Sequence, residues 1–343
     1  MRAGFFQGLG ALVVITIGVL ACDPVAAYAQ NGNTIYACVA KGQGLARIVP
    51  ADVACRPNET RVSWNVMGPQ GPAGPQGEPG PAGPSGDNCV VIASLPVRIT
   101  TPGRYCLDRN FQVSLTEYDG AITIAADDVV LDLKGFSITN TADQNTSWAI
   151  GILVNGRSVT VRNGTIRRFL YGVYFLESSA SDYGLVEHIR AIDSSYGGIR
   201  VESNATVIRH NHVVNTHGGS PYASEGWPAT AAGIGAYGTN HRLVDNDVAD
   251  THGRAGAEGW GIWMNACDDC IVQGNRVGNA TADATSVGIG GGFSVRTLIV
   301  GNRIVNVNVG IYAYTAGGIL YRDNVTFGCT VPYGTGTDGG NNR

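Results

Sequence analysis

The chain has 343 residues, of which 49 are glycine and only 15% are charged. A net charge of −4 argues against a nucleic-acid-binding protein, because such a protein needs a basic face. The glycine content is about twice the usual ~7%, which is typical of chains with many tight turns or a glycine-rich segment.

Residues 1–29 have the features of an export signal. Arg2 supplies a positive start, residues 11–20 form an apolar core too short to span a bilayer, and residues 27–29 form a small-x-small cleavage site. The sequence therefore predicts a secreted or cell-surface protein without a transmembrane segment in the mature chain. A lipobox-like sequence ending at Cys22 leaves lipid anchoring as the alternative.

Residues 30–66 form a short module that contains Cys38 and Cys55. The segment is too small to bury a substantial core, so a disulfide must help to hold it together. It resembles the short cysteine-containing segment that often precedes collagen-like tracts in bacterial surface and secreted proteins.

Residues 67–87 contain six uninterrupted Gly-X-Y triplets. Only glycine fits at the crowded axis of a collagen triple helix, and proline favours the extended polyproline conformation. The segment predicts either a collagen-like neck that joins three copies of the chain in a homotrimer or a stiff monomeric spacer.

The remainder of the chain repeats one unit of about 22 residues with insertions of variable length. A Gly-Ile or Gly-Val pair opens each unit, at residues 151, 172, 198, 233, 261, 288 and 310. A column of asparagines follows at Asn163, Asn211, Asn246, Asn275, Asn302 and Asn324, with Ile189 in its place in one unit. A fixed unit with insertions is typical of a solenoid.

Short β-branched runs bounded by Gly, Asn and Asp predict that each unit is a coil of strands. Stacked asparagines can bond to the turn backbone and to the next asparagine, which keeps successive coils in register. The units resemble the right-handed parallel β-helix proteins of the pectate-lyase-like superfamily. The resemblance implies an all-β, single-stranded, right-handed solenoid, with an N-terminal cap and first coil at 88–135, repeats at 136–328 and a Gly/Asn-rich tail at 329–343.

Seven cysteines remain if the leader is removed after Ala29. In an oxidising compartment we expect the local pairings Cys38–Cys55, Cys89–Cys106 and Cys267–Cys270. Cys329 is left over, more than one coil beyond Cys270, either buried or bridging chains. The Cys267–Cys270 pair also resembles half a zinc site, but no second pair of ligands accompanies it.

Two neighbouring units carry the largest insertions, and their loops are similar to each other. Both contain Thr-His-Gly followed by Glu-Gly-Trp, and the two histidines are 35 residues apart, so stacking would place them side by side. The candidate catalytic residues are His217, Glu225, His252 and Glu258. The candidate substrate-binding residues are Tyr222, Trp227, Arg254, Trp260 and Trp263.

This set of residues suits a carbohydrate, because Trp rings stack on sugar rings while Glu and His bind hydroxyl groups. We expect recognition of an extracellular polysaccharide on the flank of the solenoid. Lyase chemistry, with His or Glu abstracting a proton next to a uronate carboxyl, and glycoside hydrolysis by paired Glu are alternatives. A structural or adhesive spike, with these side chains packing the loops onto the coils, is a third reading.

No cofactor is predicted. The relatives implied by the resemblance commonly use clusters of Asp for Ca²⁺, and this sequence offers Asp245, Asp247 and Asp250 in one coil with Asp193 two turns earlier. Asp beside the asparagine column is more often a turn residue, so Ca²⁺ stays a minor alternative.

Overall fold

The computed structural model describes residues 34–65, 88–177, 181–219, 230–254, 256–281, 284–314 and 318–343. The chain divides into two compact units, residues 1–82 and 83–343. The expected leader with Cys22 and the Gly-X-Y segment lie outside the described residues. Within the described ranges, no helix is both long enough and apolar enough to cross a membrane.

The first unit is a three-stranded antiparallel sheet in the order β2-β1-β3. Its strands are β1 (Thr34–Ala40), β2 (Ala46–Val49) and β3 (Glu59–Asn65). The expected Cys38–Cys55 disulfide is present and ties β1 to the loop that follows β2. Arg47 donates two hydrogen bonds to the Glu59 carboxylate, at 3.0 and 2.8 Å, and lowers the pKa of Glu59 to about 2. One disulfide and one ion pair therefore support a small core.

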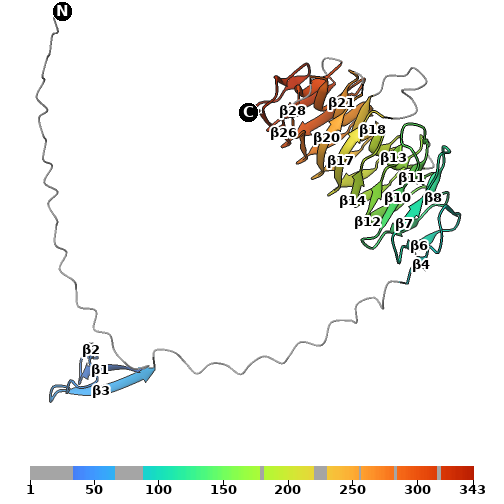
Figure 1. The fold of residues 1–343 in the computed structure, drawn as a ribbon. Helices are drawn as coiled ribbons and strands as arrows, with labels where there is room; N and C mark the ends of the chain where they lie inside the picture. The colour runs from blue at the N-terminus through green and yellow to red at the C-terminus, as the bar shows by residue number, and fades with distance from the viewer. Residues whose placement is uncertain are drawn as a thin grey trace, which may run out of the picture. The chain divides into compact units, whose positions relative to one another are not determined.

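The second unit is a solenoid built from two parallel sheets (Figure 1). The ten-stranded sheet consists of β5 (Val97–Ile99), β8 (Gly120–Ile124), β11 (Ile150–Val154), β13 (Tyr171–Phe175), β15 (Gly197–Val201), β18 (Ala231–Thr239), β21 (Gly259–Asp268), β24 (Ser286–Gly292), β27 (Val309–Ala313) and β30 (Val331–Tyr333). This sheet forms one wall of the solenoid.

The eighteen-stranded sheet forms the rest of the wall and supplies most coils with two strands. Its strands are β4 (Val90–Val91), β6 (Gly103–Cys106), β7 (Phe111–Val113), β9 (Val129–Asp132), β10 (Ser137–Asn140), β12 (Thr160–Arg167), β14 (Leu185–Ile192), β16 (Val207–Arg209), β17 (His212–His217), β19 (Arg242–Val244), β20 (Asp247–His252), β22 (Ile271–Gln273), β23 (Arg276–Gly278), β25 (Thr297–Val300), β26 (Arg303–Val305), β28 (Ile319–Arg322), β29 (Val325–Phe327) and β31 (Thr337–Asp338). Each coil pairs in register with the next, as the repeats predict for an all-β parallel β-helix.

The Gly-Ile and Gly-Val pairs lie where side chains of the eighteen-stranded sheet reach the backbone of the ten-stranded sheet. The apolar partner of each pair is fully buried and stacks in one column: Ile152, Val173, Ile199, Ile234, Ile262, Ile289 and Ile311. A Cβ atom added at Gly261 would lie 2.1 Å from Val277 Cγ1 and 2.7 Å from the Gly288 carbonyl oxygen. Glycine is required there because only a residue without a side chain fits between the walls.

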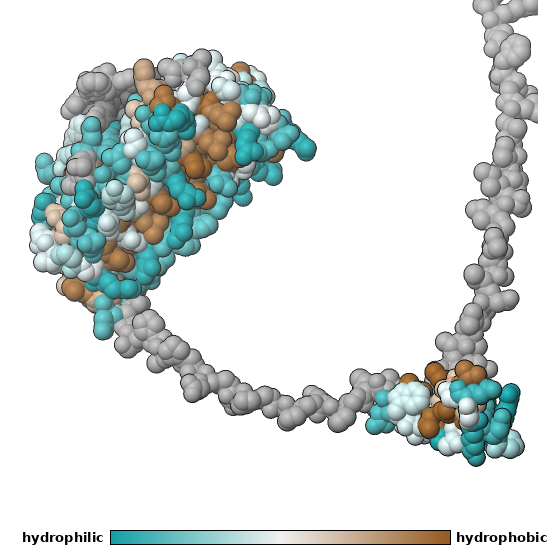
Figure 2. All heavy atoms as spheres, turned by 180° about the vertical axis from the view of Figure 1, so that it is seen from behind, coloured by the Kyte–Doolittle hydropathy of each residue, from teal (hydrophilic) through white to brown (hydrophobic). Residues whose placement is uncertain are grey.

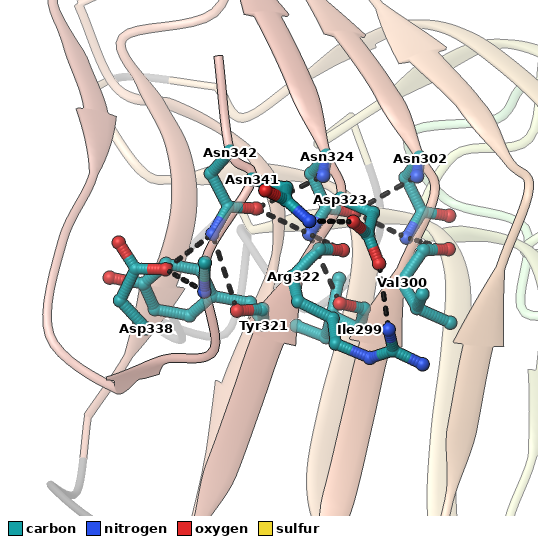
Figure 3. Close-up of polar contacts among 11 residues, drawn as sticks. Ile299, Val300, Asn302, Tyr321, Arg322, Asp323, Asn324, Asp338, Asn341 and Asn342 are labelled. Carbon is teal, nitrogen blue, oxygen red and sulfur yellow. Dashed lines mark hydrogen bonds and ion pairs between the residues drawn. The ribbon is translucent and has the colours of Figure 1, made fainter.

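The asparagine column forms a continuous hydrogen-bonded ladder inside the solenoid. Asn246 Nδ2 donates to Asn275 Oδ1 at 2.9 Å, and the Asn246 backbone N–H donates to the same oxygen at 2.9 Å. The pattern repeats from Asn211 through Asn246, Asn275, Asn302 and Asn324 to Asn342. Figure 3 shows its end, from Asn302 to Asn342. Each rung satisfies buried backbone groups as well as the next side chain, so the ladder fixes the register of the coils.

Asn163 does not belong to the ladder, and the prediction for this residue was wrong. In the strand register Gly164 takes the ladder position, opposite Ile189 of the next coil. Asn163 lies one residue earlier, at a corner with a φ of 58°, and its Nδ2 donates to Asp132. Asparagine tolerates this left-handed conformation, so it is favoured at the corner as well as in the ladder.

Regular coils extend into both segments that flank the predicted repeats. Strands β5, β6 and β7 of the expected cap pair in parallel with β8, β9 and β10. In the expected tail, β30 pairs with β27 and β31 pairs with β28. The expected Cys89–Cys106 and Cys267–Cys270 disulfides are both present, and Cys329 is a half-buried free thiol whose pKa is raised by burial.

The outside of the solenoid combines apolar and charged residues. Seen from behind, a hydrophobic stripe runs along it between polar borders (Figure 2). On the outer face of the eighteen-stranded sheet, Ile271, Leu298 and Leu320 lie in register. Residues of alternating charge lie in register on neighbouring coils of the same face: Asp132, Arg162, Glu187 and Arg209. Contacts between coils therefore stabilise the surface as well as the interior.

Replacing a ladder residue is expected to destabilise the solenoid strongly. Asn275→Ala leaves the buried Asn246 N–H and the Leu243 carbonyl without a partner, and unpaired buried groups cost about 1–3 kcal/mol each. We expect the denaturant midpoint of Asn275→Ala to fall clearly. The control is the exposed Asn155→Ala, with an effect within about 0.5 kcal/mol. Equal midpoints for the two variants would contradict a structural role for the ladder.

Acid is expected to weaken the solenoid through His241, which is fully buried. Thr206 N–H donates to His241 Nδ1 at 3.1 Å, while Nε2 lies 2.9 Å from the Tyr237 carbonyl, so the ring is held neutral. Burial lowers its pKa. The stabilisation is complete above the unfolded pKa of about 6.5 and is lost as pH falls from there toward the folded pKa.

The thermal midpoint of the native protein should therefore fall between pH 7.5 and 5.5. His241→Gln lowers stability at pH 7.5, but its midpoint should fall less over the same interval because the amide does not titrate. An equal fall in both proteins would rule out His241 as a source of the acid sensitivity.

Candidate functional site

The two predicted histidines lie side by side. His217 ends β17, His252 ends β20, and the strand register pairs them directly. The expectation that stacking places the two histidines side by side is confirmed. Tyr222, Glu225 and Trp227 from the first loop lie outside the described residues.

A loop that the sequence analysis did not single out covers the corner beside His217. Asn145, between β10 and β11, accepts a hydrogen bond from Arg254 Nη1 at 2.7 Å. Gln144 Nε2 from the same loop donates to the Asp193 carbonyl. Burial lowers the pKa of His217, and Asp193 acts in the opposite direction. This shift favours a neutral imidazole at neutral pH.

Glu258 lies just before β21 of the ten-stranded sheet, close to His252, and Trp260 lies on that strand. The Glu258 carboxylate accepts hydrogen bonds from Trp260 Nε1 at 3.1 Å and from the Tyr314 hydroxyl at 2.9 Å. Burial, followed by the bond to Glu258, raises the pKa of Tyr314 to about 12. Glu258 therefore acts as a fixed acceptor that holds two aromatic side chains.

The two predicted tryptophans of β21 are stacked. Their ring centroids are 5.9 Å apart with an interplanar angle of 20°. Trp260 is only 1% exposed, whereas Trp263 is half-buried and reaches the surface. Of the predicted pair, Trp263 has a ring that solvent or a ligand can contact, and Trp260 supports it from beneath.

The tryptophans belong to a larger set of rings on the outer face of the ten-stranded sheet, which we call the aromatic strip. Its members are Tyr171, Tyr174, Tyr196, Tyr237, Trp260, Trp263, Tyr312 and Tyr314. The Tyr237 and Trp263 centroids are 5.8 Å apart, and those of Tyr312 and Tyr314 are 5.1 Å apart. The rings therefore follow one another along the solenoid.

An ion pair lies in the middle of the aromatic strip. Arg200 Nε donates to Glu202 Oε1 at 2.6 Å, and the Tyr174 hydroxyl donates to Glu202 Oε2 at 2.6 Å. The Arg200 guanidinium carbon lies 4.5 Å from the Tyr237 ring centroid and 5.4 Å from that of Tyr171. Burial raises the pKa of Tyr237 to about 12. Cation–π contacts and charge pairing together fix these side chains.

A hollow of about 600 Å³ opens beside this ion pair. It is lined by Glu177, Glu202, Ser203, Asn204, Tyr237, Gly238 and Ala266. The hollow shares Glu202 with the ion pair and Tyr237 with the aromatic strip. The hollow and the aromatic strip therefore form one continuous surface. Carboxylate, amide and hydroxyl groups line it next to an aromatic ring, which is the composition of a site for a polyhydroxylated ligand.

The tyrosines and the ion pair were missed by the sequence analysis, although a signal for them exists. The residue after each Gly-Ile or Gly-Val pair points outward from the ten-stranded sheet. In four coils this residue is Tyr174, Arg200, Trp263 or Tyr312. The predicted site residues were chosen from the inserted loops and their ends, whereas these residues belong to the strands.

Three of the four acidic residues considered for Ca²⁺ have protein partners, among them Asp193, whose Oδ1 accepts from Asn215 Nδ2 at 2.6 Å. Asp250 Oδ1 accepts the Ala280 N–H at 2.6 Å, and Asp247 pairs with Arg276 at 3.3 Å. Among the residues that the structure describes, one group has a metal-like arrangement: Cys38, Cys55 and Glu59. Its two cysteines are joined in a disulfide and do not offer thiolates.

Comparisons with solved structures find several proteins of low sequence identity that match about the length of the solenoid. Tailspike protein 2 from Escherichia coli O157:H7 bacteriophage CAB120 is 15% identical with a TM-score of 0.43, covering 71% of this chain and 37% of that one. Tailspike gp49 from Acinetobacter baumannii bacteriophage Fri1, a capsular polysaccharide depolymerase, is 11% identical with a TM-score of 0.39, covering 68% and 48%. The periplasmic alginate epimerase AlgG, as a double mutant, is 12% identical with a TM-score of 0.40, covering 67% and 60%.

This chain thus spans 37% to 60% of the length of those three proteins. No curated protein sequence matches it. The family model described as "Right handed beta helix region" matches residues 150–327, which is more than half of the chain. The chain belongs to this right-handed β-helix family.

Proposed function

We propose that the protein binds an extracellular polysaccharide along the outer face of the ten-stranded sheet. The observation that carries this proposal is the aromatic strip, which runs beside a polar hollow of about 600 Å³. Aromatic rings stack on the apolar faces of sugar rings, while carboxylates, amides and hydroxyls bind sugar hydroxyl groups. Both kinds of contact are available on one surface.

The length of the aromatic strip favours a polymer over a single sugar. Its rings run from β13 to β27, which are five coil steps apart in the ten-stranded sheet. At a strand spacing of about 4.8 Å, this distance is roughly 24 Å. A polysaccharide that lies parallel to the solenoid axis would contact several rings at once, and its affinity would be the sum of weak contacts.

A purely structural role of the rings predicts that all of them are buried in packing contacts. Tyr171, Tyr174 and Trp260 do form a buried floor, with exposures of 3%, 6% and 1%. Tyr314 is 49% exposed, and Trp263 also reaches the surface. A layer of surface rings above a buried floor favours a binding face over a packing role.

Catalysis on the bound glycan is a second candidate function, favoured by His217. Its lowered pKa leaves a neutral imidazole that can accept a proton at neutral pH. Cleavage by a lyase would raise absorbance from unsaturated ends, and hydrolysis would release reducing ends. Loss of either signal in His217→Gln, with glycan binding retained, would assign His217 to the chemistry.

Export of the chain is part of the proposal and is supported by its three disulfides. Disulfides form and persist in oxidising compartments outside the cytosol. The Gly-X-Y segment remains the basis for proposing a homotrimer, which would present three aromatic strips per particle and increase avidity for a polymer. Analytical ultracentrifugation of the exported protein distinguishes a trimer from a monomer.

Removing surface rings from the aromatic strip is expected to weaken glycan binding. The double variant Trp263→Ala, Tyr312→Ala should lower affinity by about 10- to 100-fold, because truncating central aromatic contacts typically costs more than 1 kcal/mol each. Affinity electrophoresis through gels that contain laminarin, dextran, xylan, galactomannan or polygalacturonate measures the change.

Phe327→Ala is the matched control, since Phe327 is 73% exposed but lies on β29 of the other sheet. It should bind glycans as the native protein does. If native protein is not retarded by any polymer, or if the double variant is retarded as strongly as the native protein, the proposed surface is wrong.

A further inference from the structure

We propose that the Arg200–Glu202 pair makes the aromatic strip selective for uncharged polysaccharides over uronate polymers. This inference rests on the proposed function and names the ligand class of the same surface. Three features support it: the carboxylates on the surface, the pairing of Arg200 with Glu202, and the positions of other arginines.

The surface offers carboxylates to a ligand. Glu177 and Glu202 both line the hollow, and no Lys or Arg is among the lining residues that the structure describes. Glu258 lies under the other end of the aromatic strip, bonded to Trp260 and Tyr314. A uronate carboxylate brought to this surface would meet like charges, whereas sugar hydroxyls would find hydrogen-bond acceptors.

Arg200 is the cation that contacts the rings, and its charge is already compensated. Its Nε and Nη2 both donate to the same Glu202 oxygen, and its side chain is only 18% exposed. In the described part of the strip, the Arg200 guanidinium is enclosed by the rings of Tyr171, Tyr174, Tyr196 and Tyr237. Recognition of a carboxylate uses guanidinium donors that are available as a fork, and here Glu202 occupies that fork.

Three other exposed arginines lie on a different face. Arg190, Arg276 and Arg303 lie in one register column on the outside of the eighteen-stranded sheet. Arg276 and Arg303 are direct neighbours with like charge, and Asp247 pairs with Arg276. Arg98 lies on the outer face of the ten-stranded sheet, but three coil steps before Tyr174 and outside the aromatic strip.

Glu202→Gln tests the role of the ion pair directly. Glutamine has the same shape and can still accept from the Tyr174 hydroxyl, but it leaves the Arg200 charge uncompensated beneath the binding face. The native protein should bind laminarin or another neutral polymer at least tenfold more tightly than polygalacturonate at equal ionic strength. Glu202→Gln should bind polygalacturonate about tenfold more tightly than the native protein, so the ratio of its polygalacturonate affinity to its laminarin affinity should rise.

The matched control is Glu187→Gln. Glu187 forms the same kind of pair with Arg209, whose Nε and Nη2 donate to it at 2.9 and 2.7 Å on the outside of the other sheet. This variant releases an arginine charge away from the aromatic strip. It should not gain polygalacturonate binding, and adding Trp263→Ala and Tyr312→Ala to Glu202→Gln should remove the gain.

Glu177→Lys is the second variant, in case Glu202→Gln fails to fold. Glu177 is exposed and lines the same hollow, so a lysine there places a cation on the surface without opening the ion pair. It should gain polygalacturonate binding severalfold. Thermal unfolding of each variant separates a binding change from a folding defect.

The outcomes separate this inference from the proposed function. Absence of binding to every polymer ends the proposed function. A native protein that prefers polygalacturonate, and loses it in the Trp263→Ala, Tyr312→Ala variant, overturns the selectivity while glycan binding by the strip stands. A neutral preference without any gain in Glu202→Gln, or in Glu177→Lys if Glu202→Gln does not fold, also overturns the assignment, because the ion pair would then not be its cause.

Discussion

Parallel backbone hydrogen bonds hold the coils of this solenoid one strand spacing apart, and the asparagine ladder determines which residues face each other across that spacing. Every asparagine from Asn211 to Asn324 donates to the Oδ1 oxygen of the next one, and the last acceptor is Asn342. A shift of one residue between coils would turn inward side chains outward. Such a shift would break the hydrogen bonds of the ladder and would place side chains against the opposite sheet at the glycine column, so both columns disfavour it.

The aromatic strip is a direct result of this register. Tyr174, Arg200, Trp263 and Tyr312 come from different coils, yet each follows the same glycine and aliphatic pair. Because the aliphatic residue of each pair faces the interior, the residue after it lies on the outer face of the sheet, in one register column. Contacts between rings far apart in the sequence, such as Tyr237 with Trp263, follow from that alignment without a separate folding element.

The fold could be predicted from the sequence because its signals repeat. The Gly-Ile pairs, the β-branched runs and the asparagines agree over many units, and the stacking of His217 on His252 followed from their spacing. Asn163 was misplaced because corner and ladder positions are adjacent and both favour asparagine. The proposed glycan surface was only partly predicted. Trp260 and Trp263 were found through their loops, but the cage of tyrosines around Arg200 needs the register of three coils, which no single unit contains.

The last rung of the ladder has an implication for assembly. Asn342 accepts from Asn324, but its own Nδ2 turns back to Asp338 at 2.6 Å and to the Tyr321 carbonyl at 3.3 Å within the same end of the molecule (Figure 3). A second solenoid that docked onto this end would meet a terminal amide whose donors are already used. Open β-helix ends are natural templates for fibre growth. Here Asp338 and the Tyr321 carbonyl accept the Asn342 amide donors, which disfavours hydrogen bonding of a further coil to the asparagine column.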